Sequence, residues 1–211
     1  MQTQLIKINP NRPAVSTLKK AAAIIKKGGL VVLPTDTVYG LVCDATNPEA
    51  VRKLFQIKKR PLSQPLSIAL SDLLHIYKYV ENLPNLAEVL AKKFLPGPLT
   101  LVINKSKLIP DVVTAGRDDI GIRIPDSKIV LMLIKLTRRP IVIPSANIHN
   151  RPSPTTAQQA LKDLNGKVDL ILDGGKTKYG IESTVVSLTN NEIKILREGE
   201  ISTEEIFSCV K

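Results

Sequence analysis

The sequence predicts an α/β protein whose twisted sheet mixes parallel and antiparallel strands and carries flanking helices. Apolar strand-like runs and helical patterns alternate through the first two thirds of the chain, which is typical of this fold class. Two further strand-like runs flank Asn190-Asn191 and predict an antiparallel hairpin. The hydrophobic fraction is 43% while aromatic residues make up 3%, so the core is expected to consist of Ile, Leu, Val and Ala, which suits a sheet covered by helices.

A strand followed by a polar loop is the most informative segment. Leu30 to Leu33 have the length and branching of a strand buried on both faces, and Pro34 is expected to end its hydrogen-bonding ladder. Thr35 and Thr37 then place hydroxyl groups behind the strand, ahead of an expected turn at Gly40. Because ligands bind at strand ends in open α/β sheets, these hydroxyls indicate a site.

Caps and apolar stripes mark the expected helices. A first helix is expected from the cap Ser16 to the glycine pair Gly28-Gly29. A second begins at Asn47-Pro48 and is stopped by Pro61, which turns Arg60 away from the helix axis. The remaining helices are expected over residues 71–79, 85–93, 127–136 and 156–164, and from a capping box at 202–205.

Short apolar and β-branched runs predict the other strands. They cover residues 66–70, 99–104, 121–124, 141–143, 168–173, 184–188 and 192–196. No internal repeat, low-complexity tract or long linker interrupts this order, and the 15 prolines are spread among loops. Residues 1–211 are therefore expected to form one domain.

The charge and the cysteine content limit the classes of function that the protein can have. The 30 Lys and Arg exceed the 19 Asp and Glu, giving a formal net charge of +11 that favours a polyanionic partner such as nucleotide phosphates or RNA. Cys43 and Cys209 lie far apart and the histidines are His75 and His149, so neither a disulfide framework nor a zinc cluster is expected. Neither a signal peptide nor a membrane-spanning run is recognisable, so a cytoplasmic protein without a membrane partner is expected.

Two short stretches carry candidate chemistry. Lys58 and Arg60 could point towards one anion, with Arg60 as a bidentate fork and Lys58 as a point charge. The alternative, which spacing alone favours, is that these cations complement the helix dipole. Ser145 and Asn147 follow a predicted strand and could hold phosphate oxygens, ribose or a polar substrate, although such residues also bond their own turn.

Several common catalytic motifs are excluded. Asp173-Gly-Gly-Lys-Thr177 resembles the end of a P-loop, but Leu170 stands where that pattern requires glycine. There is no GxSxG, HExxH, EF-hand or GxGxxG pattern. The remaining cations, hydroxyls, amides and glycines suit reactions that depend on positioning and on charge neutralisation of polyanions, of which nucleotidyl transfer is one.

Eight blocks occur in order along nearly the whole chain. They are PTDTVYGL (34–41), KKRP (58–61), PLS (65–67), PGPLT (96–100), GIRIP (121–125), PSAN...RPSPT (144–155), DGG...GIESTVV (173–186) and LREGEIS (196–202). Together they resemble the YrdC-like family of L-threonylcarbamoyl-adenylate synthases. The resemblance implies a twisted sheet with a basic concave face, where L-threonine, bicarbonate or CO2, and ATP give threonylcarbamoyl-adenylate and pyrophosphate. That product would serve threonylcarbamoyladenosine formation in tRNA through a downstream threonylcarbamoyl transferase.

The resemblance also implies roles for individual residues. The family's Lys-x-Arg and Ser-x-Asn pairs match the expected catalytic residues Lys58, Arg60, Ser145 and Asn147. The residues expected to hold threonine are Thr35, Arg123 and Ser183. The residues expected to hold ATP are Lys58, Arg60, Thr114, Ser145, Ser153 and Arg197. ATP is the expected nucleotide substrate, Mg²⁺ is expected to accompany it, and no metal site made by the protein is expected.

Three departures and two alternatives accompany this hypothesis. Ala69 stands where some members carry histidine, Glu198 replaces the usual proline before Gly199, and the chain stops at Lys211 where longer members continue. The first alternative is a non-catalytic module that binds double-stranded RNA or tRNA through phosphate contacts. The second is a carbamoyl-transfer domain of the hydrogenase-maturation type, which normally lies within a longer chain. Oligomeric state and direct contact with tRNA are left open.

Overall fold

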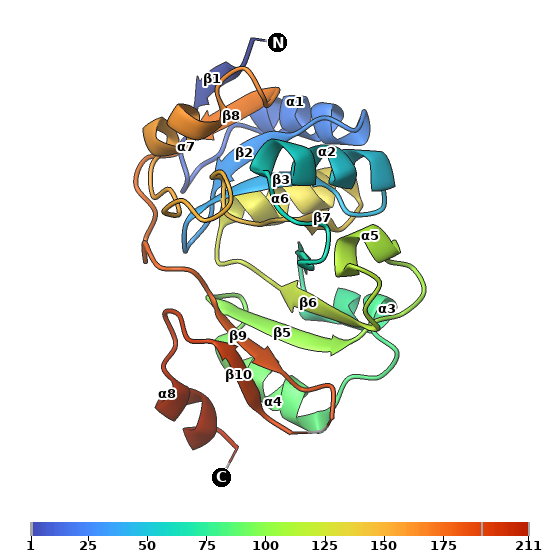
Figure 1. The fold of residues 1–211 in the computed structure, drawn as a ribbon. Helices are drawn as coiled ribbons and strands as arrows, with labels where there is room; N and C mark the ends of the chain where they lie inside the picture. Colours follow the sequence, from blue (N-terminus) through green and yellow to red (C-terminus); the bar gives the residue numbers. More distant parts are fainter. Residues whose placement is uncertain (1, 191, 211) are drawn as a thin grey trace.

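The computed structural model describes residues 2–190 and 192–210, and the strands within these ranges join into one sheet (Figure 1). The strands are β1 (Gln4–Lys7), β2 (Val31–Pro34), β3 (Tyr39–Asp44), β4 (Ser67–Ala69), β5 (Leu99–Asn104), β6 (Asp119–Arg123), β7 (Ile141–Val142), β8 (Leu170–Asp173), β9 (Thr184–Ser187) and β10 (Lys194–Arg197). Their order is β1-β8-β2-β3-β7-β4-β6-β5-β9-β10. Pairing is parallel at β1–β8, β8–β2, β4–β6 and β5–β9 and antiparallel elsewhere, which confirms the predicted mixed sheet.

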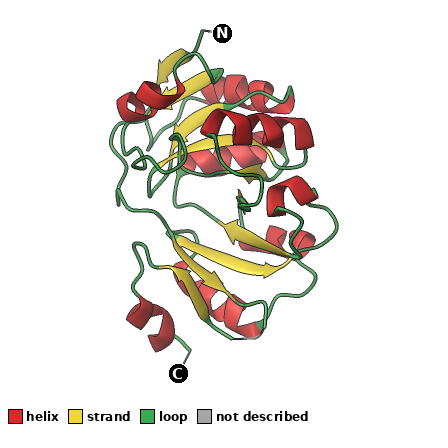
Figure 2. Ribbon diagram, viewed as in Figure 1, coloured by secondary structure: helices red, strands yellow, loops and turns green. Residues whose placement is uncertain are grey.

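Helices flank the strands (Figure 2). They are α1 (Val15–Lys26), α2 (Pro48–Lys58), α3 (Ile76–Tyr79), α4 (Asn85–Phe94), α5 (Asp111–Thr114), α6 (Lys128–Thr137), α7 (Ala157–Leu164) and α8 (Thr203–Ser208), with a 3₁₀ turn η1 (Leu73–His75) before α3. The first strand and the last helix lie at opposite ends of the molecule. Within the described parts of the chain, no helix is long and apolar enough to cross a membrane.

The core divides into two apolar clusters on the two faces of the sheet. In β2, Val32 belongs to one cluster, while Val31 and Leu33 belong to the other, as the alternation of side chains along a strand requires. The first cluster contains Leu54 of α2 and the second contains Leu133 of α6. Strand β2 is therefore buried on both faces, as predicted.

The first helix ends where its glycines predict but begins earlier than expected. Val15 is its first residue and Ala14 its N-cap, without a side-chain hydrogen bond, so the predicted cap at Ser16 is wrong. At the other end, Gly28 adopts φ of +78°, which favours glycine, and its N–H donates to Ile25 at 2.9 Å. This turn leads the chain directly into β2.

The second helix is capped as predicted and releases Arg60 from its axis. Asn47 accepts hydrogen bonds from the N–H groups of Glu49 and Ala50. After the last turn, Lys59 adopts a left-handed conformation with φ of 53°, and the N–H of Arg60 donates to Phe55 at 3.0 Å. The chain therefore changes direction at Lys59, so that Lys58 lies within α2 and Arg60 lies outside it.

Two other points of the prediction need correction, and one is confirmed. Gly40 lies inside β3 opposite Leu33, so the reversal occurs between β2 and β3 and not at Gly40. Strand β1 and helix α5 were not predicted, because each has four residues and little periodicity. The antiparallel pairing of β9 with β10 confirms the hairpin, although Asn191 of its expected turn lies outside the described residues.

Candidate active site

A cavity of about 310 Å³, here called the main cavity, collects residues from all eight sequence blocks. Its walls come from the loop between β2 and β3, the end of α2, the segment after β7 and the segment before β9. Nine of the ten predicted site residues line it: Thr35, Lys58, Arg60, Arg123, Ser145, Asn147, Ser153, Ser183 and Arg197.

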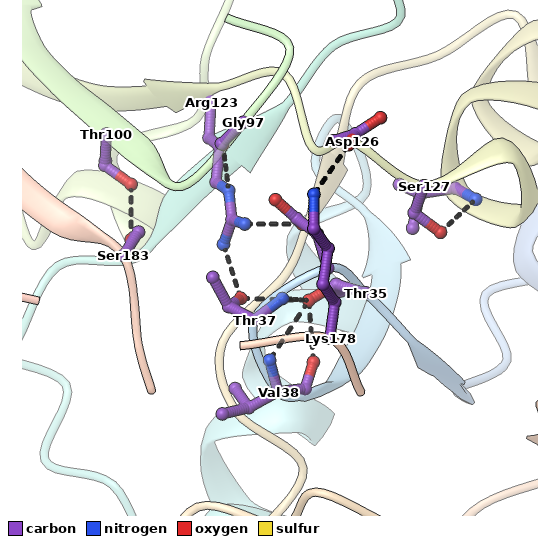
Figure 3. A network of polar contacts seen from close by, with 12 residues as sticks. Thr35, Thr37, Val38, Gly97, Thr100, Arg123, Asp126, Ser127, Lys178 and Ser183 are labelled. Carbon is purple, nitrogen blue, oxygen red and sulfur yellow. Dashed lines mark hydrogen bonds and ion pairs between the residues drawn. The ribbon is translucent and has the colours of Figure 1, made fainter. Parts of the chain in front are cut away.

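The hydroxyl of Thr35 holds the loop between β2 and β3 in shape. Its Oγ1 donates to the carbonyl of Val38 at 2.7 Å and accepts from the N–H groups of Thr37 at 3.0 Å and Val38 at 3.2 Å. It also lies 2.9 Å from Oγ1 of Thr37 (Figure 3). Thr35 therefore orders the turn, and Thr37 extends the hydrogen-bond network towards the opposite wall.

Arg123 is held rigidly on that opposite wall. Its guanidinium donates to Oδ1 of Asp36 at 2.6 Å, to Oγ1 of Thr37 at 2.8 Å and to the carbonyl of Gly97 at 3.1 Å. Figure 3 shows Arg123 between Gly97 and Thr37. Burial lowers the pKa of Arg123, and the charge of Asp36 opposes this shift. These contacts fix the orientation of a cation that borders the cavity.

Lys58 uses its ammonium group to hold the segment after β7. Its Nζ donates to the carbonyl of Ser145 at 2.5 Å, to the carbonyl of Asn147 at 2.8 Å and to Oδ1 of Asn147 at 3.2 Å. These contacts engage all three ammonium donors. Burial, with a further contribution from the charge of Arg60, lowers the pKa of Lys58 to about 8. Lys58 therefore fixes the conformation of this part of the cavity wall, and its positive charge adds to the electrostatic potential in the cavity.

Arg60 lies beside Lys58 but is oriented by a different segment. Its Nε donates to the carbonyl of Gln64 at 3.2 Å and its Nη2 to that of Pro65 at 2.9 Å. Burial lowers the pKa of Arg60, although the nearby charge of Glu182 opposes that shift. The guanidinium borders the cavity with its direction set by two backbone carbonyls.

Glu182 and Arg197 form an ion pair at the edge of the main cavity. Ser153 Oγ donates to Oε1 of Glu182 at 2.6 Å, and Arg197 Nη2 donates to the carbonyl of Ser183 at 2.9 Å. Burial raises the pKa of Glu182, but the hydrogen bond from Ser153 and the charge of Arg197 outweigh it and lower the pKa. Glu182 is thus an ionised carboxylate within a largely cationic cavity.

Gly199 preserves the close packing behind this ion pair. A Cβ atom at Gly199 would lie 2.2 Å from the carbonyl oxygen of Glu182 and 2.6 Å from the carbonyl carbon of Ser183. Glu198, which departs from the usual proline, accepts a hydrogen bond from the N–H of Thr203 at 3.2 Å. The substitution therefore ties this loop to α8, while the glycine keeps the close approach.

Two residues singled out in the sequence lie away from the main cavity. Thr114 is fully buried in α5, where its hydroxyl donates to the carbonyl of Asp111 at 3.5 Å, and it is not among the lining residues. Its expected place at ATP is not supported by this position. Ala69 is fully buried in the second apolar cluster and adds no polar group to the cavity wall.

Seven polar lining residues were not predicted as site residues: Thr37, Ser67, Thr100, His149, Asn150, Arg151 and Glu182. Thr100 Oγ1 lies 2.8 Å from Ser183 Oγ, so it supports a residue that was predicted. Each of the seven lies within one of the eight sequence blocks. Membership of a block was the sequence signal that could have identified these residues. Residue type alone did not show which residues of each block face the main cavity.

The described residues do not offer a dedicated metal site. Within residues 2–190 and 192–210, no group of three or more His, Cys, Asp and Glu could hold a metal ion. The carboxylate of Glu182 in the cavity is already bonded to Ser153 and Arg197. A divalent cation in this cavity would therefore take most of its ligands from substrate oxygens and water, as Mg²⁺ does at phosphate sites.

The fold and the cavity define an α/β protein in which oriented arginines and hydroxyl groups surround one cavity. A family model named Sua5/YciO/YrdC, with the description "Telomere recombination", matches residues 23–199. The chain belongs to this family.

Relatives and a solved structure agree with that membership. The chain is 45% identical to threonylcarbamoyl-AMP synthase of Pyrococcus abyssi over 92% of its own length and 57% of that protein. It is 38% identical to the Bacillus subtilis protein of the same name, over 96% of this chain and 58% of that one. The structure of P. abyssi Sua5 complexed with L-threonine superposes with a TM-score of 0.96 at 42% identity, covering 99% of this chain and 61% of that one. The chain thus spans less than two thirds of the length of these relatives.

Proposed function

We propose that this protein is an L-threonylcarbamoyl-AMP synthase that condenses L-threonine, bicarbonate or CO2, and ATP. The observation that carries the proposal is the convergence of Arg60, Arg123 and Arg197 on one cavity that is also lined by hydroxyl groups. The names of the relatives from P. abyssi and B. subtilis support it, as does the L-threonine complex of P. abyssi Sua5. This activity makes the protein a nucleotidyltransferase.

The proposed reaction has two bond-forming steps. The amine nitrogen of threonine attacks the carbon of CO2, and loss of a proton leaves a carbamate; starting from bicarbonate, that proton leaves with a hydroxide group as water. A carbamate oxygen then attacks the α-phosphorus of ATP, the bond to the β-phosphate oxygen breaks, and pyrophosphate leaves. Carboxylate, carbamate and triphosphate repel one another, so the main task of the protein is to neutralise and align them.

The cavity contacts support a division of labour among its residues. Arg123 and Ser183, with Thr35 ordering the adjacent loop, would hold the carboxylate and hydroxyl groups of threonine. Arg60 and Arg197 would bind ATP phosphates, each with its guanidinium oriented by backbone carbonyls. Ser145 and Ser153 would add hydroxyl donors to the nucleotide. Because Lys58 bonds directly to Asn147, these two would act by shaping the wall and by contributing charge.

Mg²⁺ is proposed to enter with the nucleotide. When bound, it would neutralise part of the triphosphate charge and favour departure of pyrophosphate. Glu182, already ionised at the cavity edge, is the carboxylate among the described lining residues that could meet a hydrated cation. Arg60 and Arg197 would still supply the fixed positive charges of the site.

The proposal extends to the destination of the product. Threonylcarbamoyl-adenylate is a mixed anhydride that would pass to a transferase acting on tRNA. One sheet joins β1 to β10, which supports a single domain over residues 1–211. A cytoplasmic location fits both the substrates and the tRNA-directed product.

The experiment is a pyrophosphate-release assay with ATP, run with both L-threonine and bicarbonate and with each omitted in turn. Release should require both co-substrates, and L-serine or L-valine at the same concentration should serve as controls for the amino acid. Mass spectrometry should detect threonylcarbamoyl-AMP in the complete mixture. ATP breakdown that ignores threonine would rule out the synthase.

A further inference from the structure

A second pocket, of about 270 Å³, lies at the other end of the strands that border the main cavity. Gly40 of β3 lines the main cavity, whereas Pro140, which lines the second pocket, bonds through its carbonyl to the N–H of Ala45 just beyond β3. The strand rise of about 3.3 Å per residue separates Gly40 from Ala45 by roughly 16 Å. The two pockets are therefore separate sites.

The second pocket is bordered by four cations from three parts of the chain. Lys78 belongs to α3, Lys135 belongs to α6, and Arg138 and Arg139 form the connection from α6 to β7. All four are exposed residues. Across residues 2–190 and 192–210, no ion pair involves Lys78, Lys135 or Arg138. Their charges are thus free to act on a solute.

Arg139 is held in place from behind. The side chain of Asp44 is fully buried and pairs with Nη1 of Arg139, whose own side chain is 46% exposed. Thr46 fixes the carboxylate in turn, since its N–H and its hydroxyl donate to Oδ1 of Asp44 at 2.8 and 2.7 Å. This guanidinium is already held on one side and exposed on the other. It would therefore lose little further conformational entropy when it binds an anion.

The helix dipole explains only part of this arrangement. Lys135 and Arg138 lie at the C-terminal end of α6, where cations are favourable in any case. Lys78 lies on another helix, and Arg139 is oriented by Asp44, so neither is accounted for in this way. Among the described residues, no carboxylate lines this pocket; Asp44 pairs with Arg139, and Asp72 pairs with the lining residue His75 at 3.0 Å. Positive charge therefore prevails in the pocket.

We propose that the second pocket binds phosphate groups of a polyanion, either the backbone of RNA or a free oligophosphate. Arginine matches phosphate geometry with two parallel hydrogen bonds, and lysine adds a mobile point charge. The net charge of +11 favours such ligands over the whole surface, and this pocket concentrates four of the cations around one hollow. The inference does not depend on the proposed synthase activity.

Lysine footprinting tests the site directly and does not measure activity. The protein is acetylated with a limiting amine reagent, alone, with inorganic pyrophosphate, or with a short RNA duplex, and modified peptides are quantified by mass spectrometry. Acetylation of Lys78 and Lys135 should slow, while that of Lys19 and Lys20 on α1, which are also exposed, should not. Slowing by pyrophosphate assigns the pocket to free phosphates, and slowing by the duplex alone assigns it to RNA. Unchanged acetylation with both probes, or equal slowing at all four lysines, would overturn the proposal.

A matched pair of variants separates a local site from general charge. The change Lys135→Gln with Arg138→Gln removes two charges from the pocket, and Lys19→Gln with Lys20→Gln removes two from α1. If RNA is the occupant, the slope of log affinity against log salt should fall by about two in the first variant and by less than about one in the second. Equal changes in both variants would reject RNA as the occupant. Circular dichroism of both variants checks that the fold is retained.

Discussion

Asp36 and Arg123 form an ion pair at 2.6 Å in which the aspartate side chain is fully enclosed and the arginine side chain is 9% exposed. The pair joins the loop after β2 to the end of β6, on two segments far apart in the sequence. Oδ1 of Asp36 accepts the bond, while Oδ2 has no partner among the described residues. The position of Arg123 in the main cavity therefore depends on a buried carboxylate that does not itself line the cavity.

Asp36→Asn should destabilise the protein strongly, because it leaves the buried charge of Arg123 without a counter-charge. We expect the free energy of unfolding in urea to fall by about 3 kcal/mol. Asp119→Asn is the matched control, since Asp119 pairs with a largely exposed Arg117 and should cost less than about 1 kcal/mol. If the two variants are equally stable, the ion pair does not stabilise the fold in this way.

Lys58 should make stability depend on pH in the alkaline range. Its pKa in the folded protein is about 8, below its ordinary value of 10.5, so between these values the unfolded chain binds more protons than the folded one. The free energy of unfolding should therefore rise from pH 8 to 10.5, by about 3 kcal/mol from this group alone. Urea unfolding of the wild type and of Lys58→Met over this range isolates the effect, because the variant lacks it. Parallel curves for the two proteins would show that the pKa is not shifted.

The sequence predicted the sheet class and most helices. The helices were predictable because capping residues mark their ends. Asn47 caps α2, and the expected capping box opens α8. Strand β1 was missed because its four residues alternate weakly and its partner β8 lies far along the chain. The turn was misplaced at Gly40 because Thr35 bonds the N–H groups of the loop with its side chain, and a hydroxyl can do this without glycine.

Most of the predicted site residues do line the main cavity, but several of their contacts were not predicted. Lys58 and Arg60 were considered as a pair that could share one anion, although spacing alone favoured the helix dipole, and the left-handed turn at Lys59 sends the two side chains to different carbonyl groups. The carboxylate partner of Arg123 could not be predicted either. Asp36 and Arg123 are brought together by the packing of the whole sheet, and such a pair leaves no mark in local periodicity.

Gly199→Ala should disturb the main cavity without touching its charged groups. The added Cβ would collide with backbone atoms of Glu182 and Ser183, which cannot move aside as a side chain can. We expect a loss of about 3 kcal/mol in the free energy of unfolding, at the upper end of overpacking effects, together with weaker ATP binding. Gly116→Ala is the comparison, because its Cβ would meet nothing within 4 Å and only its φ of +75° is unfavourable for alanine, whereas Gly199 has no positive φ. A loss for Gly199→Ala smaller than that for Gly116→Ala would show that the collision is relieved at little cost.

Arg60→Ala should reduce threonine-dependent pyrophosphate release on the order of a hundredfold, since a fixed donor to developing phosphate charge is lost. The guanidinium is oriented by the carbonyls of Gln64 and Pro65, so Arg60→Lys keeps the charge but not the direction and should recover only part of the rate. Lys59→Gln removes a neighbouring exposed charge and should leave the rate within about twofold, because screened surface charges act weakly. Initial rates at saturating L-threonine, bicarbonate and ATP distinguish these cases from weaker binding. A rate for Arg60→Ala close to that of Lys59→Gln would remove Arg60 from the proposed catalytic residues.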